Sequence, residues 1–264
     1  MELSKRLKAV ADMVPPGSVV CDVGCDHGYV PIYLIQNRIC TNVIAMDIHA
    51  GPLEQAREHI GRYDLEAYIE TRQSDGLAAL QAGEADCVIL AGMGGRLTVR
   101  ILQGGRDILE AVDTLILQPQ SEIASVRAYL RDAGYGIVRE DMVWEGGKYY
   151  PMLQARRSQP NAALPSDGDM WMRGGQGDAQ ALRQAADDRY GPYLLTHRHP
   201  ALHRFLLWER EREERILSGI CCGAAAETPE NRKRCEELRL AARIRAYALS
   251  CFEQRPERGN GHEM

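Results

Sequence analysis

The stretch Val19-Val20-Cys21-Asp22-Val23-Gly24-Cys25-Asp26-His27-Gly28 decides the fold of this 264-residue chain. A β-branched apolar run leads into a turn with two glycines, which predicts a strand followed by the start of a helix. Open α/β sheets bind their ligands at this edge, and Gly24 and Gly28 let a ligand approach the backbone closely. Asp22 and Asp26 would repel a nucleotide phosphate, and the GxGxxG spacing is not met. The turn therefore disfavours NAD and favours a ligand that carries cationic groups.

Short β-branched runs alternate with helical segments through the first half of the chain, which is typical of a parallel sheet covered on both faces. The predicted strands are residues 18–22, 42–47, 67–72, 86–91 and 113–118, and the predicted helices are residues 28–37, 51–62, 94–103 and 121–133. Two further runs, 136–144 and 148–156, are separated by Glu145-Gly146-Gly147. That connection is too short for a parallel crossover, so it predicts an antiparallel hairpin. The predicted fold class is α/β, with five parallel strands and an antiparallel terminal hairpin.

The composition changes after this hairpin. Residues 158–178 are rich in Pro, Gly, Asp, Asn and Ser, which indicates a linker or a loose insertion. Two long helical stretches follow, residues 200–220 and 229–252, each with proline at its start. They predict an antiparallel, coiled-coil-like arm in which the charged run 208–215 is a solvated face. The predicted division is a sheet domain (1–157), a linker or insertion (158–196) and a helical arm (197–264).

Composition narrows the class of protein. No apolar run is long enough to cross a bilayer, and the first 16 residues read as an amphipathic helix rather than a secretory signal. The eight cysteines show neither a metal-type CxxC pair nor a dense disulfide spacing, so a reduced, cytoplasmic protein without a metal is expected. The net charge of −5 argues against a general nucleic-acid binder, but residues 197–264 carry 13 Lys and Arg against 11 Asp and Glu. The arm is thus the only segment with a positive balance.

Acidic residues also follow the second and third predicted strands. Asp47 ends the second strand, where its carboxylate can accept both hydroxyls of a ribose; the alternative is a helix N-cap. Asp75 follows the third strand, where it can accept from the amino group of an adenine; the alternative is an ordinary Asp-Gly turn.

The fourth strand ends in Ala91-Gly92-Met93-Gly94-Gly95. Neither an Asn/Asp-Pro-Pro-Tyr/Phe motif nor a Pro-Cys nucleophile is present at this edge. The glycines remove side-chain bulk and leave backbone N–H groups free, so a ligand can approach this edge closely. The alternative is that they serve close packing at the start of a helix.

The first motif, Asp22-x-Gly24-x-Asp26-x-Gly28, resembles motif I of class I S-adenosylmethionine-dependent methyltransferases, with Asp26 in place of the middle glycine. Over nearly its full length the chain resembles the bacterial tRNA (adenine-22-N1)-methyltransferase family. The segments that carry the resemblance are Leu3-Ser4-Lys5-Arg6-Leu7, Asp22-Val-Gly-Cys-Asp-His27, Gly51-Pro52-Leu53, Asp75-Gly76-Leu77, Ala91-Gly92-Met93-Gly94-Gly95, Leu117-Gln118-Pro119 and Tyr190-Gly191-Pro192. Gln120 departs from the asparagine that is commoner in the family, and Asp47 from a frequent glutamate.

The resemblance implies a Rossmann-like class I methyltransferase sheet with a C-terminal coiled-coil arm, S-adenosyl-L-methionine as cofactor and N1 of a D-arm adenosine of tRNA as the methyl acceptor. The expected cofactor-binding residues are Asp22, Gly24, Asp26, His27, Asp47, Asp75, Gly76, Gly92, Met93 and Gly94. The expected substrate-positioning residues are Asp26, Tyr29 and Met93, with His27 as a further candidate to orient the base; each of Tyr29 and His27 can instead be a packing residue. The expected RNA contacts are Arg198, Arg204, Arg232, Lys233, Arg239 and Arg243.

Two alternatives stay open from the sequence. A small-molecule methyltransferase would share the cofactor half, but it has no obvious use for the arm. A non-catalytic RNA-binding protein with a relict cofactor fold would not need acids at three successive strand ends. Neither a membrane nor an obligate protein partner is implied.

Overall fold

The computed structural model describes residues 1–157, 176–220 and 228–253. Contacts within the chain divide it into two compact units, Met1–Met170 and Trp171–Met264. Each unit is described by itself. Most of the linker predicted at 158–178 lies outside the described residues.

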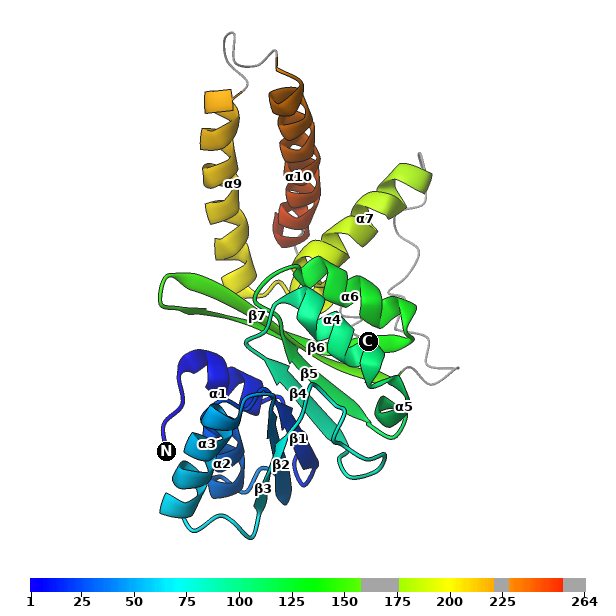
Figure 1. Cartoon of the computed structure of the whole chain (residues 1–264). Coiled ribbons are helices and arrows are strands. Elements are labelled where there is room, and N and C mark those ends of the chain that lie inside the picture. Colours follow the sequence, from blue (N-terminus) through cyan, green and yellow to red (C-terminus); the bar gives the residue numbers. More distant parts are fainter. Residues whose placement is uncertain (158–175, 221–227, 254–264) are drawn as a thin grey trace, which may run out of the picture. The chain divides into compact units, whose positions relative to one another are not determined.

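The first unit is built on one seven-stranded sheet in the order β3-β2-β1-β4-β5-β7-β6 (Figure 1). Its strands are β1 (Val19–Val23), β2 (Asn42–Asp47), β3 (Ile69–Gln73), β4 (Cys87–Ala91), β5 (Thr114–Gln118), β6 (Tyr135–Glu145) and β7 (Lys148–Arg157). Strands β1 to β5 are parallel, whereas β7 is antiparallel to both β5 and β6. The prediction of five parallel strands finished by an antiparallel hairpin is confirmed, with strand ends shifted by one or two residues.

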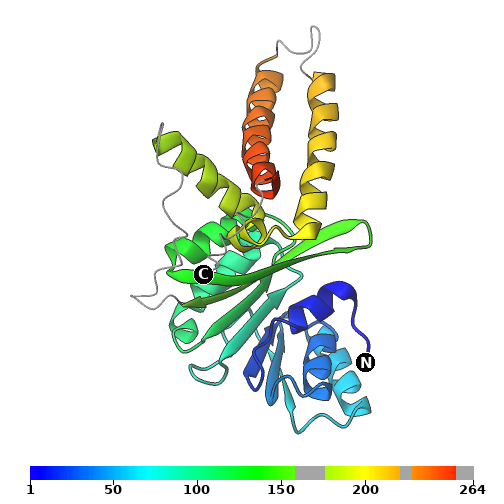
Figure 2. The ribbon, with the colours of Figure 1, turned by 180° about the vertical axis from the view of Figure 1, so that it is seen from behind.

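Helices cover both faces of this sheet, as the two sides in Figures 1 and 2 show. They are α1 (Lys5–Ala11), α2 (Tyr29–Gln36), α3 (Ala50–Arg62), α4 (Gly95–Gly104), α5 (Arg106–Leu109) and α6 (Ile123–Asp132). One core holds buried residues of α1, α2 and α3 with Val20, Val43 and Ile89 of the sheet. The other holds residues of α4, α5 and α6 with Cys21, Ile44 and Val88. Because alternate strand residues enter opposite cores, the central strands are mostly apolar, and Asp22 near the end of β1 is an exception.

The terminal hairpin extends past the carboxyl end of its neighbour. Pairing between β5 and β7 covers only residues 114–117 and 153–156, so residues 148–152 pair with β6 alone. Gly146 and Gly147 form the two-residue turn, and both have positive φ (56° and 79°), as a tight hairpin turn requires. The hairpin tip therefore lies at the sheet edge that the sequence marks as the ligand side.

The second unit contains more helix than the sequence predicted. Its helices are α7 (Gln176–Tyr190), α8 (Pro192–Thr196), α9 (Pro200–Ile220) and α10 (Pro229–Glu253). Residues 176–196 were placed in the linker or insertion, and that interpretation is wrong for α7 and α8. The segment was missed because its buried positions in α7, Ala186 and Tyr190, are too few to give a clear apolar stripe. Helix α10 contacts α7 and α8 as well as α9, so it has more partners than a two-helix coiled coil supplies.

The charged run of α9 is only partly solvated. Glu213 is buried and pairs with the buried Arg245 of α10, and also with Arg189 of α7. Glu209 accepts from Arg189 (2.7 Å) and from the Tyr190 hydroxyl (2.6 Å). These two glutamates hold α7, α9 and α10 together, which corrects the prediction of a wholly solvated face. Cys235 of α10 is disulfide-bonded, so the expectation of reduced cysteines is wrong there.

Candidate active site at the carboxyl edge of the sheet

The first turn after β1 is tied to β2 through its backbone. The amides of Gly24 and Cys25 both donate to the carbonyl oxygen of Met46, at 2.8 and 2.9 Å. Gly24, Asp26 and Gly28 all have positive φ, which glycine adopts freely and Asp26 adopts at a cost. A Cβ on Gly24 would lie 2.6 Å from Cε of Met93, so the absence of a side chain lets the turn approach the end of β4.

Two carboxylates lie at the ends of β1 and β2. Asp22 is buried, and this burial, with a smaller contribution from the charge of Asp47, raises the pKa of Asp22 to about 7. Neither acid forms an ion pair with a cationic side chain in the part of the chain that the structure describes. A buried, partly ionised carboxylate without a cation is suited to an ammonium group supplied by a ligand.

Asp47 also has a structural role. Its carboxylate oxygens accept from the backbone amides of Asp26 (3.3 Å) and His49 (3.0 Å). Helix α3 has His49 at its N-cap, so the alternative of Asp47 as the N-cap residue is wrong. The carboxylate instead fixes the first turn against β2, and its remaining lone pairs point to no other donor of the described residues.

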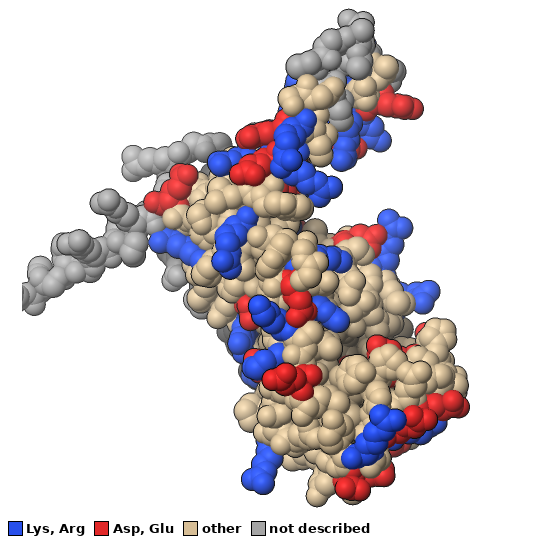
Figure 3. Space-filling model, turned by 90° about the vertical axis from the view of Figure 1, so that its left-hand side faces the viewer, with Lys and Arg blue, Asp and Glu red and all other residues tan. Residues whose placement is uncertain are grey.

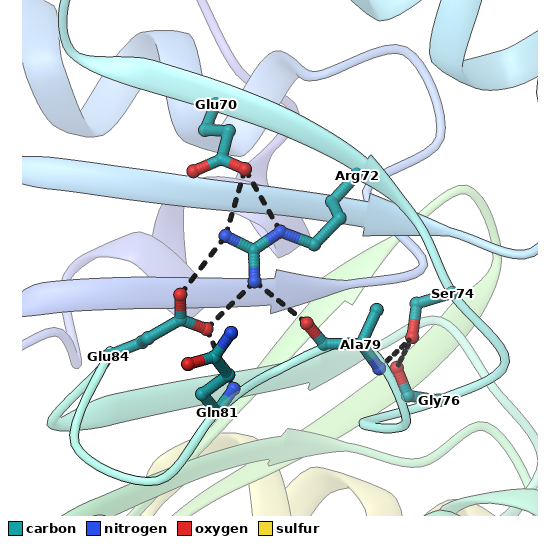
Figure 4. A network of polar contacts seen from close by, with 7 residues as sticks. All are labelled: Glu70, Arg72, Ser74, Gly76, Ala79, Gln81 and Glu84. Atoms are coloured by element: carbon teal, nitrogen blue, oxygen red, sulfur yellow. Dashed lines mark hydrogen bonds and ion pairs between the residues drawn. The ribbon is translucent and has the colours of Figure 1, made fainter.

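Asp75 follows β3, between Ser74 and Gly76. Figure 4 shows the polar network that holds this loop in place. Arg72 of β3 donates to the carbonyl of Ala79 (2.7 Å) and pairs with Glu84 and Glu70, each at 2.8 Å. These partners raise the pKa of Arg72 and lower that of Glu84, the hydrogen bond between them being the main cause.

The hydroxyl of Ser74 stabilises the turn that carries Asp75 through two hydrogen bonds. The Ser74 hydroxyl donates to the Gly76 carbonyl (2.9 Å) and accepts from the Ala79 amide (3.0 Å). Gly76 has a φ of 60°, so the Asp-Gly turn offered as an alternative is present. The Asp75 side chain is exposed and remains available to a ligand.

Aromatic side chains gather beside the first turn. Tyr29 stacks on His59 of α3, with ring centroids 5.4 Å apart and an interplanar angle of 17°, and lies 5.5 Å from His27. Nδ1 of His59 is 3.0 Å from the carbonyl oxygen of His27; a carbonyl only accepts, so this nitrogen carries the hydrogen. Tyr29 is 38% exposed. Sequence reasoning missed His59, because only the packing of α3 against α2 brings it here.

The Asp26 side chain lies at the outer edge of this group. It is 68% exposed and 3.4 Å from Nε2 of His27. The structure thus brings Asp26, His27 and Tyr29 together on one side of the first turn.

The glycines after β4 have different structural settings. A Cβ on Gly95 would lie 2.5 and 2.8 Å from the carbonyl oxygens of Ser121 and Glu122, so this glycine is needed for close packing. A Cβ on Gly94 would lie 3.2 Å from Oγ of Ser121. Gly92, by contrast, is exposed and has a φ of 84°. A Cβ on Gly92 would have no atom closer than 3.8 Å. The packing alternative therefore holds for Gly95, while Gly92 leaves open space at the edge.

The predicted RNA contacts lie in the second unit. Arg204, Arg232, Lys233, Arg239 and Arg243 are exposed, and Arg198 is half-buried. Arg245, with its buried partner Glu213, has no access to a phosphate. Basic and acidic side chains are mixed on the face of the arm that Figure 3 shows, so this face is not a uniformly basic surface.

Comparison with known proteins places the chain among methyltransferases. A family model described as a methyltransferase domain matches residues 3–153. The tRNA (adenine(22)-N(1))-methyltransferase of Bacillus subtilis is 33% identical over 238 residues, which cover 90% of this chain and 93% of that protein.

Solved structures agree over both units. The crystal structure of the B. subtilis m1A22 tRNA methyltransferase is 30% identical, with a TM-score of 0.76, and the match covers 94% of this chain and 99% of that one. A Streptococcus pneumoniae protein solved in complex with S-adenosyl-L-methionine is 30% identical, with a TM-score of 0.75 and coverage of 94% and 100%. In the described residues, no helix is long and apolar enough to cross a membrane.

Proposed function

The chain belongs to the tRNA (adenine(22)-N(1))-methyltransferase family, and we propose that it transfers a methyl group from S-adenosyl-L-methionine to N1 of adenosine 22 in tRNA. The observation that carries the proposal is the pair of acids at the ends of β1 and β2. Asp22 and Asp47 face the ligand edge without a cationic partner among the described side chains, inside a chain that matches the family over nine-tenths of its length.

These residues fit the cofactor. Asp22 would hold the ammonium of the methionine part, and Asp47 would accept from the ribose hydroxyls. Asp75, on the loop fixed by Arg72, would accept from the adenine amino group. When bound, S-adenosylmethionine supplies the methyl group as a carbon attached to positively charged sulfur.

The chain has little proton chemistry to perform. N1 of neutral adenine carries an in-plane lone pair, so it forms the new N–C bond as the S–C bond breaks, and the base takes up the positive charge. The protein needs to hold N1 in line with the methyl group, and positioning of this kind supplies about 7–11 kcal/mol of the barrier. Because N1 lies on the Watson–Crick face, the base must leave its pair and stack. Tyr29, backed by His59, would supply one stacking surface, and its π face would favour the cationic product.

We place the second RNA contact on the arm. The predicted basic contacts on α9 and α10 would follow the phosphate backbone while the first unit holds the base. The test replaces Arg204, Arg232, Lys233, Arg239 and Arg243 together by glutamine. The KM for tRNA should rise at least tenfold while the affinity for S-adenosylmethionine stays unchanged. Arg210→Gln, an exposed arginine of α9 outside this set, is the matched control.

The test of the activity itself is labelled methyl transfer to unmodified tRNA, followed by nucleoside digestion and mass spectrometry. Label in 1-methyladenosine supports the proposal. Label in another nucleoside would contradict the choice of acceptor. Cofactor binding without transfer to any RNA would favour the small-molecule alternative. As an enzyme of tRNA modification, the protein would act in the cytoplasm.

A further inference from the structure

Two sequence segments that the proposed function leaves without a role meet at the ligand edge. Arg6 comes from Leu3-Ser4-Lys5-Arg6-Leu7 at the start of α1, and Gln118 is the last residue of β5. Nη1 of Arg6 donates to Oε1 of Gln118 at 2.8 Å. Gln118 pairs with Ala91 in the sheet, and its carbonyl accepts from the amide of Gly92 at 3.1 Å. The contact therefore lies next to the open end of β4.

The orientation of the Gln118 amide follows from this contact. A guanidinium has donors only, so the amide oxygen must face Arg6 and the amide nitrogen must face elsewhere. Gln118 is wholly buried, and its Nε2 has no hydrogen-bond partner among the residues that the structure describes. Native proteins rarely leave a buried donor unsatisfied, so this orientation costs stability and is retained because the amide oxygen holds Arg6.

The backbone and ring contacts around Arg6 hold it in place. The backbone amides of Lys5 and Arg6 donate to the Glu145 carboxylate at the hairpin tip, at 2.7 and 3.4 Å. The guanidinium carbon lies 5.6 Å from the centre of the Tyr150 ring. Yet in the described chain the guanidinium forms no ion pair: its one hydrogen bond goes to a neutral amide. A partly buried arginine held in this way keeps most of its donors for an anion.

Gly92 provides the access. A Cβ at this position would lie 3.8 Å from Nη1 of Arg6 and 3.8 Å from Nε2 of Gln120. Two donor groups thus border the space that the missing side chain leaves. This end of the edge is rich in donors, whereas the ends of β1 and β2 carry acids.

We propose that Arg6, oriented by Gln118, binds a backbone phosphate next to the target adenosine. The inference rests on the proposed function, since it names the part of the RNA that this edge takes. The base itself is the poorer candidate for this site, because methylation makes it cationic and a guanidinium beside it would oppose the reaction. A phosphate carries the negative charge and the acceptor oxygens that the Arg6 guanidinium lacks. Arg6 touches the substrate, and Gln118 is a positioning residue.

The first experiment compares wild type with Arg6→Met, Arg6→Lys and Gln118→Met. Arg100→Met, an exposed arginine of α4 outside the site, is the matched control. For Arg6→Met we expect kcat/KM for tRNA to fall about 10- to 100-fold with unchanged affinity for S-adenosylmethionine. Arg6→Lys should recover part of the loss, and Gln118→Met should show a smaller loss in the same parameter. The slope of log kcat/KM against log salt should decrease by about one unit in Arg6→Met only.

The second experiment removes the charge from the RNA. Two tRNAs carry a methylphosphonate in place of the phosphate 5′ or 3′ to the target adenosine. With one of these RNAs, the kcat/KM of the wild type should fall about as much as the Arg6→Met substitution lowers kcat/KM for the natural tRNA. The same RNA should not lower the kcat/KM of the Arg6→Met variant further. Equal slowing of wild type and variant by both RNAs, or an unchanged salt slope, would overturn the phosphate site. A wild type that methylates no unmodified tRNA would refute the proposed function, and the phosphate site with it.

Discussion

Binding of the cofactor should depend on pH through Asp22. Burial raises the pKa of this carboxyl to about 7, while the cofactor's ammonium needs it ionised. The α-amino group of a free amino acid stays protonated below about pH 7.5, so of the two groups in this ion pair it is Asp22 that changes its charge between pH 5.5 and 7. About 3% of Asp22 is ionised at pH 5.5 and about half at pH 7, so the affinity should rise about 15-fold over this interval.

The assay is calorimetric titration with S-adenosylhomocysteine, which keeps the ammonium and lacks the reactive sulfonium. Repeating it at pH 6 in buffers of different ionisation enthalpy counts the protons released, and about 0.9 per bound ligand is expected. Asp22→Asn is the matched control: it should bind more weakly and show no pH dependence. In Asp47→Asn the midpoint should move to lower pH, since the charge of Asp47 contributes to the raised pKa. Equal wild-type affinity at pH 5.5 and 7 would refute the assignment of Asp22 to the ammonium.

Three further predictions concern the stability of the folded protein. Asp22→Asn should stabilise the unliganded protein against urea at pH 8 but not at pH 4. The pKa of Asp22 is about 7 in the folded state and near 4 in the unfolded state, so ionisation of this carboxyl lowers the free energy of unfolding as the pH rises through this interval. The substitution removes this loss, and the gain should be a few kcal/mol. Arg127→Met should lower the free energy of unfolding by about 3–5 kcal/mol, since it removes the guanidinium that lies 2.8 Å from the buried carboxylate of Glu140, and joint replacement of both residues by apolar ones should recover most of the loss. Gly95→Ala should destabilise by about 1–3 kcal/mol because its Cβ meets the backbone of Ser121 and Glu122, whereas Gly104→Ala, with nothing within 4 Å, should not lower the melting temperature.

The sheet could be read from the sequence because its signals are local. Buried strands are continuous apolar runs, and the hairpin follows from the few residues between two such runs. Asp22, Asp47 and Asp75 were found because each follows a strand, and parallel strands bring their carboxyl ends to one edge.

The remaining features depend on contacts between distant segments. His59 and Arg6 reach the site from α3 and α1 only through helix packing. The pairing of Glu213 with Arg245 spans 32 residues, so the glutamate could not be separated from its solvated neighbours by sequence alone. The same holds for Gly92 and Gly95, since the carbonyls of Ser121 and Glu122 decide which glycine is structural.

Methyl transfer to a matched pair of tRNA transcripts tests the central claim most directly. The two RNAs differ only at position 22, which is adenosine in one and guanosine in the other. The account predicts 1-methyladenosine in the first RNA and no incorporation in the second, with the same cofactor affinity in both reactions. Equal methylation of both transcripts, or of neither, would contradict it.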